Sequence, residues 1–157
     1  MLVNTKHFGQ IDLDESKIIH FENGIMGFES FKNYTVLYDD IEGEKSDISW
    51  LQSLDEATLA IPIISPFIIM DQYNPEVEDE YLLPLGNLNE DNLVVFVTIT
   101  VPKEAKDISA NLKAPIIINS ETKKGAQLIA QNSEYEIKYR FYEKLKERKT
   151  EKEGVSC

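Results

Sequence analysis

The sequence predicts a mainly β protein, folded as a small antiparallel β-barrel-like domain with few short helices. Two observations carry this prediction. Short segments that are apolar, or that alternate apolar and polar residues, recur along the chain and are separated by turn residues. Helical segments are few and short, and many short strands are typical of a barrel or a sandwich. We expect one domain over residues 1–142, followed by a charged tail over residues 143–157.

The N-terminal part of the chain contains four strand candidates, each containing β-branched or aromatic residues. Asn23-Gly24 predicts a turn after the first of them, with a positive φ at the glycine. Between the second and the third, acidic residues surround Gly43 and predict a loop over residues 39–47. Ser65-Pro66 ends the fourth. The four candidates cover residues 17–21, 34–38, 48–54 and 59–64.

A second acidic segment covers residues 71–80 and contains no basic residue. Its sequence suits a loop, or a short helix that begins at Pro75 and is capped by Asn74. A polar turn is expected over residues 87–92. Further strand candidates complete the domain, and the first of them is the clearest in the chain because it is almost continuously apolar. They cover residues 93–101, 116–118, 125–130 and 134–141.

Residues 109–119 are the most informative stretch. A polar lead-in, Asn111-Leu112-Lys113, precedes Ala114-Pro115 and three consecutive isoleucines. Proline has no amide hydrogen, so Pro115 fits the start or the edge of a strand. Continuous β-branched residues suit a strand covered on both faces. Since the stretch holds no nucleophile and no metal ligand, it predicts a packing and recognition element, with residues 111–115 for a partner and residues 116–118 for the core.

The formal net charge of −12 at pH 7 narrows the classes of partner. Nucleic-acid binding requires Lys and Arg to neutralise phosphates, so we expect no direct contact with nucleic acid. An acidic chain is instead attracted to a basic protein. No apolar run reaches the roughly 20 residues of a membrane span. The first residues lack the pattern of a signal peptide, so we expect a cytoplasmic protein without membrane contact.

Side chains suited to catalysis or metal binding form no recognised pattern. The single cysteine, Cys157, cannot build a thiolate cluster, and the spacing of His7 and His20 matches no metal site, so we expect neither metal nor cofactor. Two alternative roles stay open. A β-barrel module could bind a small ligand or another protein, with a cavity between strands. Neighbouring carboxylates such as Asp39-Asp40 or Asp79-Glu80 could serve a hydrolase if they lay in a cleft.

With these motifs placed, the chain resembles the FliW family of flagellar assembly factors from about residue 5 to residue 140. Each motif is weak alone, but their order and spacing are specific. Met26 stands where the family usually has leucine, which conserves volume. The motifs are Phe8-Gly9, residues 19–28 with Phe31 and Tyr34, Trp50-Leu51-Gln52-Ser53-Leu54-Asp55, Pro62 and Pro66, residues 109–119, and Gly125-Ala126-Gln127 with Tyr135.

The resemblance implies a β-barrel-like cytoplasmic protein that is not an enzyme. Proteins of this family bind newly made flagellin near its terminal helical region and hold it before export. They also bind CsrA, a small RNA-binding dimer that represses flagellin translation, and the two partners compete. Accumulated flagellin therefore frees CsrA and stops its own synthesis. The antagonism of CsrA in this family looks noncompetitive with RNA.

Two groups of residues are the candidate binding sites. The charge density of the acidic segment favours a site for CsrA, which carries cations to hold RNA. The lead-in is too specific in sequence for a plain strand and favours a site for flagellin, whose amphipathic terminal segments suit an apolar groove. The CsrA candidates are Asp71, Glu76, Glu78, Asp79 and Glu80, and the flagellin candidates are Asn111, Leu112, Lys113, Pro115 and Ile117.

Overall fold

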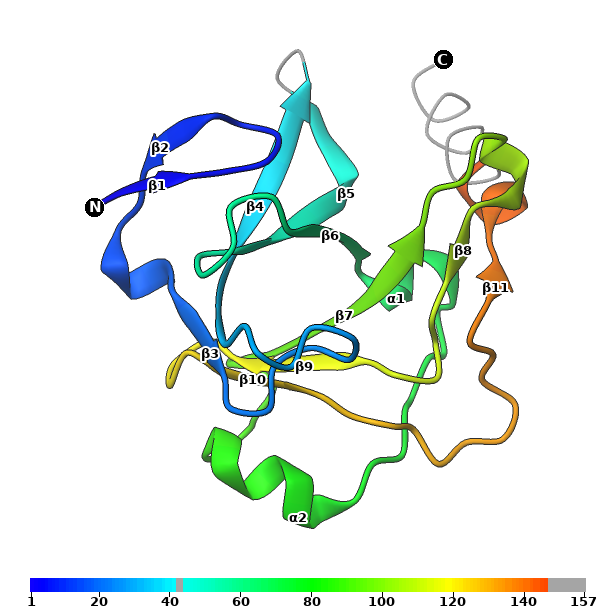
Figure 1. The fold of residues 1–157 in the computed structure, drawn as a ribbon. Helices are drawn as coiled ribbons and strands as arrows, with labels where there is room; N and C mark the ends of the chain where they lie inside the picture. Colours follow the sequence, from blue (N-terminus) through cyan, green and yellow to red (C-terminus); the bar gives the residue numbers. More distant parts are fainter. Residues whose placement is uncertain (42–43, 147–157) are drawn as a thin grey trace.

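The computed structural model describes residues 1–41 and 44–146 of the chain. Seven of the described strands form a closed barrel (Figure 1). The ring runs in the order β7, β6, β5, β4, β3, β10 and β9, and the pairing of β9 with β7 closes it. The bounds are β3 (Ile19–Phe21), β4 (Asn33–Ile41), β5 (Glu44–Ser53), β6 (Ala60–Ile64), β7 (Leu93–Thr100), β9 (Ile116–Asn119) and β10 (Lys124–Gln127).

Shorter elements surround the ring. β8 (Ser109–Ala110) pairs with the end of β7, and β11 (Tyr139–Arg140) pairs with β8. A separate N-terminal hairpin consists of β1 (Leu2–Asn4) and β2 (Gln10–Asp12) (Figure 1). No helix in the described residues is long and apolar enough to cross a membrane. The short helices are η1 (Glu15–Lys17), α1 (Pro66–Ile69), α2 (Asp79–Leu82), η2 (Leu83–Leu85) and η3 (Ala105–Asp107), and residues 142–146 are also helical.

The structure confirms the predicted fold class, with one departure from antiparallel pairing. β10 runs parallel to β3, and Gly125 lies opposite Phe21 in this pair. The other described strand pairs are antiparallel. A Cβ at Gly125 would lie 2.6 Å from Cε1 of Phe21, so only glycine leaves room for the ring. This close approach of backbone to ring is what allows β10 to pack against β3 and complete the barrel.

Apolar side chains form two clusters on opposite faces of β6 and β7. Neighbouring residues of a strand point to opposite faces, so Ile63 and Phe96 belong to one cluster while Ile64 and Val97 belong to the other. We call them the barrel-interior cluster and the side cluster. The barrel-interior cluster comprises Ile19, Phe21, Ile25, Tyr34, Leu51, Ile61, Ile63, Phe96, Ile116 and Ile118. The side cluster comprises Ile64, Ile69, Tyr73, Val97, Ile99, Ile108, Ala110, Leu112, Ala130, Tyr135 and Phe141.

The predicted acidic loop over residues 39–47 is wrong. β4 and β5 pair across this segment, with Asp40 opposite Lys45 and Ile41 opposite Glu44. Ladder hydrogen bonds join backbone groups, so the hairpin continues beyond the apolar residues that mark the two strands in the sequence. The strand predictions over residues 34–38, 48–54 and 59–64 are confirmed by β4, β5 and β6, whereas the one over 17–21 shortens to β3 because Lys17 belongs to η1.

The acidic segment is a loop as far as Glu78, which agrees with the first of its two alternatives, and a helix begins at Asp79 and not at Pro75. One further prediction needs correction. Residues 134–141 are not a strand except at β11, because their alternating residues share no sheet face: Tyr135 and Phe141 are buried and Ile137 is exposed. The strand predictions over 93–101 and 116–118 are confirmed by β7 and β9, and the strand predicted over 125–130 ends at Gln127.

Candidate functional site

The acidic segment follows α1 and ends in α2, and all five of its candidate side chains are exposed. Two tyrosines of the side cluster fix its backbone. The Tyr73 hydroxyl donates to the Leu112 carbonyl at 2.7 Å, and the Asn74 N–H donates to the Tyr135 hydroxyl at 2.7 Å. The carboxylates therefore project from a segment that is tied to the core. The five are Asp71, Glu76, Glu78, Asp79 and Glu80.

The lead-in at residues 111–115 forms a bend between β8 and β9. The Asn111 side chain accepts hydrogen bonds from the N–H groups of Lys113 and Ala114, both at 3.1 Å, and so shapes this bend. Leu112 is 0% exposed and Pro115 is buried. Ile117 is 5% exposed, and Ile116 and Ile118 are buried beside it, which confirms the core assignment of the three isoleucines. Among the flagellin candidates, only Asn111 and Lys113 are accessible at the surface.

The acidic segment and the lead-in are joined through residues 131 and 132. The Lys113 ammonium donates to the Asn132 carbonyl at 2.8 Å, and the Glu76 N–H donates to Oδ1 of Asn132 at 2.7 Å. The Gln131 amide group donates to Oε1 of Glu78 at 3.2 Å. Two segments that are far apart in the sequence and were predicted as separate sites therefore lie side by side.

A groove runs between α2, the loop after β3 and the chain that follows β10. It consists of two adjoining cavities of about 380 and 690 Å³, which share Asn23, Tyr81, Gln127 and Leu128. We call these two cavities together the Tyr81 groove. α2, which borders it, lies at the end of the barrel next to β9 and β10 (Figure 1). The lining of the groove includes His20, Glu22, Asn23, Met26, Glu78, Glu80, Tyr81, Lys113, Lys124, Gln127, Leu128 and Ile129.

Large apolar side chains are exposed in the Tyr81 groove. Tyr81 is 54% exposed, Ile129 is 54% exposed and Met26 is 44% exposed. Gln127 holds two walls together, since its Oε1 accepts from the Met26 N–H at 2.9 Å and its Nε2 donates to the Ala114 carbonyl at 3.1 Å. An exposed apolar surface with a polar rim is typical of a site for another protein.

The carboxylates of Glu78 and Glu80 line the groove from α2 and its N-cap, and His20 lines it together with Glu22. The His20 ring contacts Asn33 Oδ1 at 3.1 Å and Glu22 Oε2 at 2.9 Å. Its pKa is raised, first by the hydrogen bond with Asn33 and then by the one with Glu22. Lys113 and Lys124 supply cations to the lining. The groove therefore offers an apolar centre with charges of both signs at its rim.

The arrangement suits binding, and the described residues hold no group of three or more His, Cys, Asp or Glu side chains that could coordinate a metal ion. Asp79 and Glu80 are exposed on α2, whereas the side chains of Asp39 and Asp40 lie outside those that the structure describes. The residues at the centre of the groove were missed by sequence reasoning. Tyr81 directly follows the acidic run, and Gln127 lies in a family motif, so each carried a signal that was not interpreted as a site.

Comparisons with known proteins agree on one family. A family model described as FliW protein matches residues 2–141. The chain is 51% identical over 154 residues to the flagellar assembly factor FliW of Lachnoclostridium phytofermentans, covering 98% of this chain and 99% of the relative. It is 48% identical over 147 residues to the flagellar assembly factor FliW of Lachnospira eligens, covering 93% and 97%.

The fold agrees as well. A crystal structure of the flagellar assembly factor FliW superposes with a TM-score of 0.81 at 33% identity, covering 90% of this chain and 96% of that one. Because sequence and fold match over nearly the whole length, the chain belongs to the FliW family of flagellar assembly factors.

Proposed function

We propose that this protein binds flagellin and the translational repressor CsrA in the cytoplasm, one partner at a time, and so couples flagellin synthesis to export without catalysing a reaction. The relatives are named as flagellar assembly factors, which supports the role in flagellar assembly. One observation supports the proposed competition between the two partners. Glu78 and Lys113 come from two separately predicted sites, and both line the same cavity.

Flagellin fits the apolar centre of the Tyr81 groove. An amphipathic helix binds a groove by inserting apolar side chains at intervals of three and four residues. Met26, Tyr81 and Ile129 offer such a partner an exposed apolar surface, which is anchored to the core through Gln127 and the side cluster. Leu112, Pro115 and Ile117 support this surface from the core and do not contact the partner directly.

CsrA fits the acidic rim. A protein that holds RNA carries cations, and exposed carboxylates attract such a surface at long range. Asp79 and Glu80 directly precede Tyr81 in α2. A stable interface covers about 800 Å² on each partner, so a protein seated on this rim also covers the centre of the groove. The two partners therefore exclude one another.

Charge reversal tests the acidic rim. We expect the triple variant Glu78→Lys, Asp79→Lys, Glu80→Lys to lose most CsrA binding and most of its dependence on salt. The matched control is Glu90→Lys, Asp91→Lys, Glu121→Lys, which changes the net charge equally at exposed positions outside the groove. Size-exclusion chromatography with calorimetry at two salt concentrations gives both quantities. Equal losses in the two variants would show that only net charge matters.

A single substitution tests the apolar centre. Tyr81→Ala is expected to weaken flagellin binding by about tenfold or more, because an exposed tyrosine in a groove is a typical hot spot. Leu83→Ala is the control, since Leu83 is exposed on the neighbouring η2 but does not line the groove. Mixing the protein with both partners tests exclusion. A ternary complex would refute competition, and failure to bind either partner would refute the proposal.

A further inference from the structure

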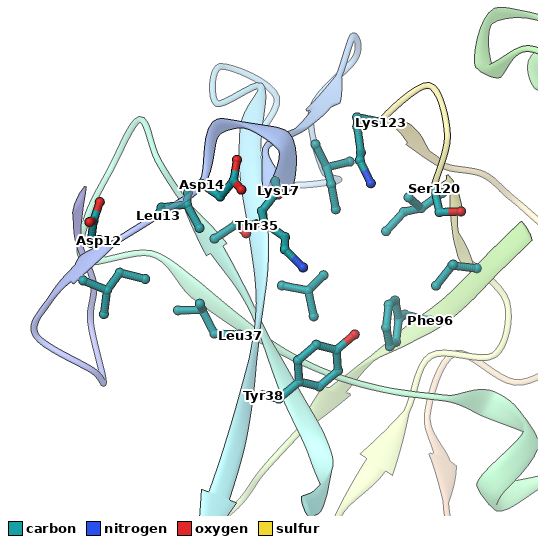
Figure 2. Close-up of a pocket in the computed structure, with 15 residues that line it drawn as sticks. Asp12, Leu13, Asp14, Lys17, Thr35, Leu37, Tyr38, Phe96, Ser120 and Lys123 are labelled. Atoms are coloured by element: carbon teal, nitrogen blue, oxygen red, sulfur yellow. Dashed lines mark hydrogen bonds between the residues drawn. The ribbon is translucent and has the colours of Figure 1, made fainter. Parts of the chain in front are cut away.

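A separate cavity, of about 500 Å³, opens in the barrel wall beside β4 (Figure 2). β3 pairs with β4 at Ile19 and His20, which lie opposite Tyr34 and Asn33. In the described register, residues 35–37 of β4 pair with β5 alone. η1 lies on one side of this opening and the β9–β10 turn on the other. The cavity shares no lining residue with the Tyr81 groove.

The inner part of this cavity is apolar. Ile19, Phe96 and Ile118 line it, and all three belong to the barrel-interior cluster. Val36 and Val94, which pack against that cluster, also line it. The cavity is therefore a path from solvent to the apolar interior of the barrel, and its volume falls in the range of sites for small molecules.

Two lysines converge at the mouth of the cavity. Lys17 comes from η1 and Lys123 from the β9–β10 turn, and Figure 2 shows both amino groups directed into the same space. In the described part of the chain neither amino group forms a hydrogen bond or an ion pair. Two carboxylates also line the cavity. Asp12 accepts from the Met1 amino group at 3.0 Å, and Asp14 accepts from the Ser16 N–H at 3.0 Å and is attracted to Lys17 without forming an ion pair with it.

The backbone of Lys123 gives an independent indication. Lys123 has a φ of 59°, and among the residues that the structure describes it is the only non-glycine residue in the left-handed region. Glycine or asparagine satisfies such a turn position with less strain, and strained positions persist where a side chain is needed. In a chain with a net charge of −12, a lysine at this strained position keeps a second cation at the cavity. The His20 N–H holds the turn by donating to the Lys123 carbonyl at 2.9 Å.

We propose that this cavity binds a small organic carboxylate with an apolar body. The carboxylate lies between the amino groups of Lys17 and Lys123, where charge-assisted hydrogen bonds are strong. The apolar body lies against Ile19, Phe96 and Ile118 inside the barrel wall. Both parts of the ligand are required, since the cations recognise the head and the barrel interior accommodates the tail.

Three probes test this division. Octanoate carries both features, octan-1-ol carries the apolar body alone and acetate carries the charge alone. We expect octanoate to bind with a dissociation constant of about 0.1 mM, octan-1-ol to bind at least about fivefold more weakly, and acetate not to bind. Methyl NMR spectra of the full chain report the position. Octanoate should shift Ile19 and Ile118 and leave Ile64 and Ile69 of the side cluster unchanged.

Substitutions of the lysines test the head group. Lys123→Gln is expected to weaken octanoate binding by about tenfold and Lys17→Gln, whose side chain is exposed, by about threefold. Lys103→Gln is the matched control, because it removes one exposed charge away from the cavity. Lys123→Gly relieves the positive φ, so it should keep or raise the melting temperature while losing affinity as Lys123→Gln does.

The outcomes separate this proposal from its rivals. Equal binding of octanoate and octan-1-ol would show a purely apolar cavity and overturn the proposal. Equal weakening by Lys103→Gln would show an effect of net charge and overturn it as well. Shifts confined to Met26 and Ile129 would place the ligand in the Tyr81 groove, and a dissociation constant above about 10 mM would show that no small carboxylate is bound.

Discussion

The barrel-interior cluster and the side cluster are stabilised in different ways. Strands surround the first, and ladder hydrogen bonds satisfy their backbone groups. Its buried Tyr34 hydroxyl has no partner in the described residues, and burial raises the pKa of Tyr34 to about 12. Irregular segments surround much of the second, and both of its tyrosine hydroxyls bond to the backbone. The Tyr73 and Tyr135 rings also contact each other, with centroids 4.7 Å apart.

The difference shows where side chains, in place of paired strands, supply the hydrogen bonds that buried backbone groups need. Buried backbone groups need hydrogen-bond partners, and paired strands supply them without any help from side chains. Segments such as residues 71–78 and 128–138 have few ladder partners, so hydroxyl and amide side chains bond to their backbone. The Tyr81 groove is bordered by these segments. Its shape therefore depends on side-chain hydrogen bonds as well as on isolated backbone bonds, such as that from the Gln131 N–H to the Glu76 carbonyl at 2.7 Å, whereas ladder bonds join the strands of the barrel.

The largest expected effect tests whether the two clusters unfold together. Phe141 is 1% exposed in the side cluster, and Phe141→Ala should lower the free energy of unfolding by about 4 kcal/mol. Because β6 and β7 contribute to both clusters, we expect a single transition in urea. Circular dichroism and Trp50 fluorescence should coincide. Ile137→Ala, at an exposed neighbouring position, should change stability by less than about 0.5 kcal/mol. Two separate transitions would show that the side cluster is an independent unit.

The next substitution tests how the barrel closes. Gly125→Ala places a Cβ 2.6 Å from the Phe21 ring, which is itself buried, so we expect a loss of about 3 kcal/mol. Gly9→Ala is the control. Gly9 has a positive φ, which Gly125 does not, but no atom lies within 4 Å of its added Cβ, so the cost should be near 1 kcal/mol and come from backbone strain alone. Equal costs in chemical denaturation would contradict a steric role for the Phe21 contact.

A tyrosine of the side cluster tests the dependence on hydroxyl groups. Tyr73→Phe leaves the buried Leu112 carbonyl without its donor, so stability should fall by about 1.5 kcal/mol. The same variant should weaken partner binding, because it loosens the acidic segment next to the lead-in. Denaturation in urea and calorimetry with flagellin measure the two effects. Unchanged stability would show that the hydroxyl bond is not needed.

The matching substitution in the barrel should not destabilise the protein, in contrast to Tyr73→Phe. Tyr34→Phe removes a buried hydroxyl that has no partner among the described groups, so stability should stay the same or rise by up to about 1 kcal/mol. The experiment is the same urea titration as for Tyr73→Phe. A loss as large as that of Tyr73→Phe would reveal a partner for the Tyr34 hydroxyl, such as a buried water.

The smallest expected effect concerns His20, which belongs to β3 of the barrel and lines the groove. Its folded pKa lies above the ordinary value of 6.5, so the protonated ring stabilises the fold. This contribution is complete below pH 6.5 and is lost as the pH rises through the raised pKa. The His20 side chain is 46% exposed, so solvent screens the interaction and the change in stability is small. His20→Gln should remove it from the pH profile of the urea midpoint, and NMR titration of the ring protons measures the pKa directly.

The sequence by itself determined the strands whose pattern is local. Residues 34–38, 48–54, 59–64, 93–101 and 116–118 predicted β4, β5, β6, β7 and β9, because β-branched and alternating residues report which faces of a strand are buried. The turn at Gly24 was also predictable, and its φ is 67°. The exposure of the acidic segment followed from its density of charge.

Only the tertiary structure decided how these pieces meet. Closure of the barrel depends on Gly125 facing Phe21, and one wall of the groove depends on Gln127 bonding to Met26. The alternating pattern over residues 134–141 resembled a strand. In the folded chain, however, Tyr135 and Phe141 are buried in the side cluster, whereas Ile137 is exposed to solvent. The groove joins Glu78 to Lys113 through Gln131 and Asn132. Periodicity reports the neighbours of a residue along the chain, whereas these contacts join residues that are neighbours only after folding.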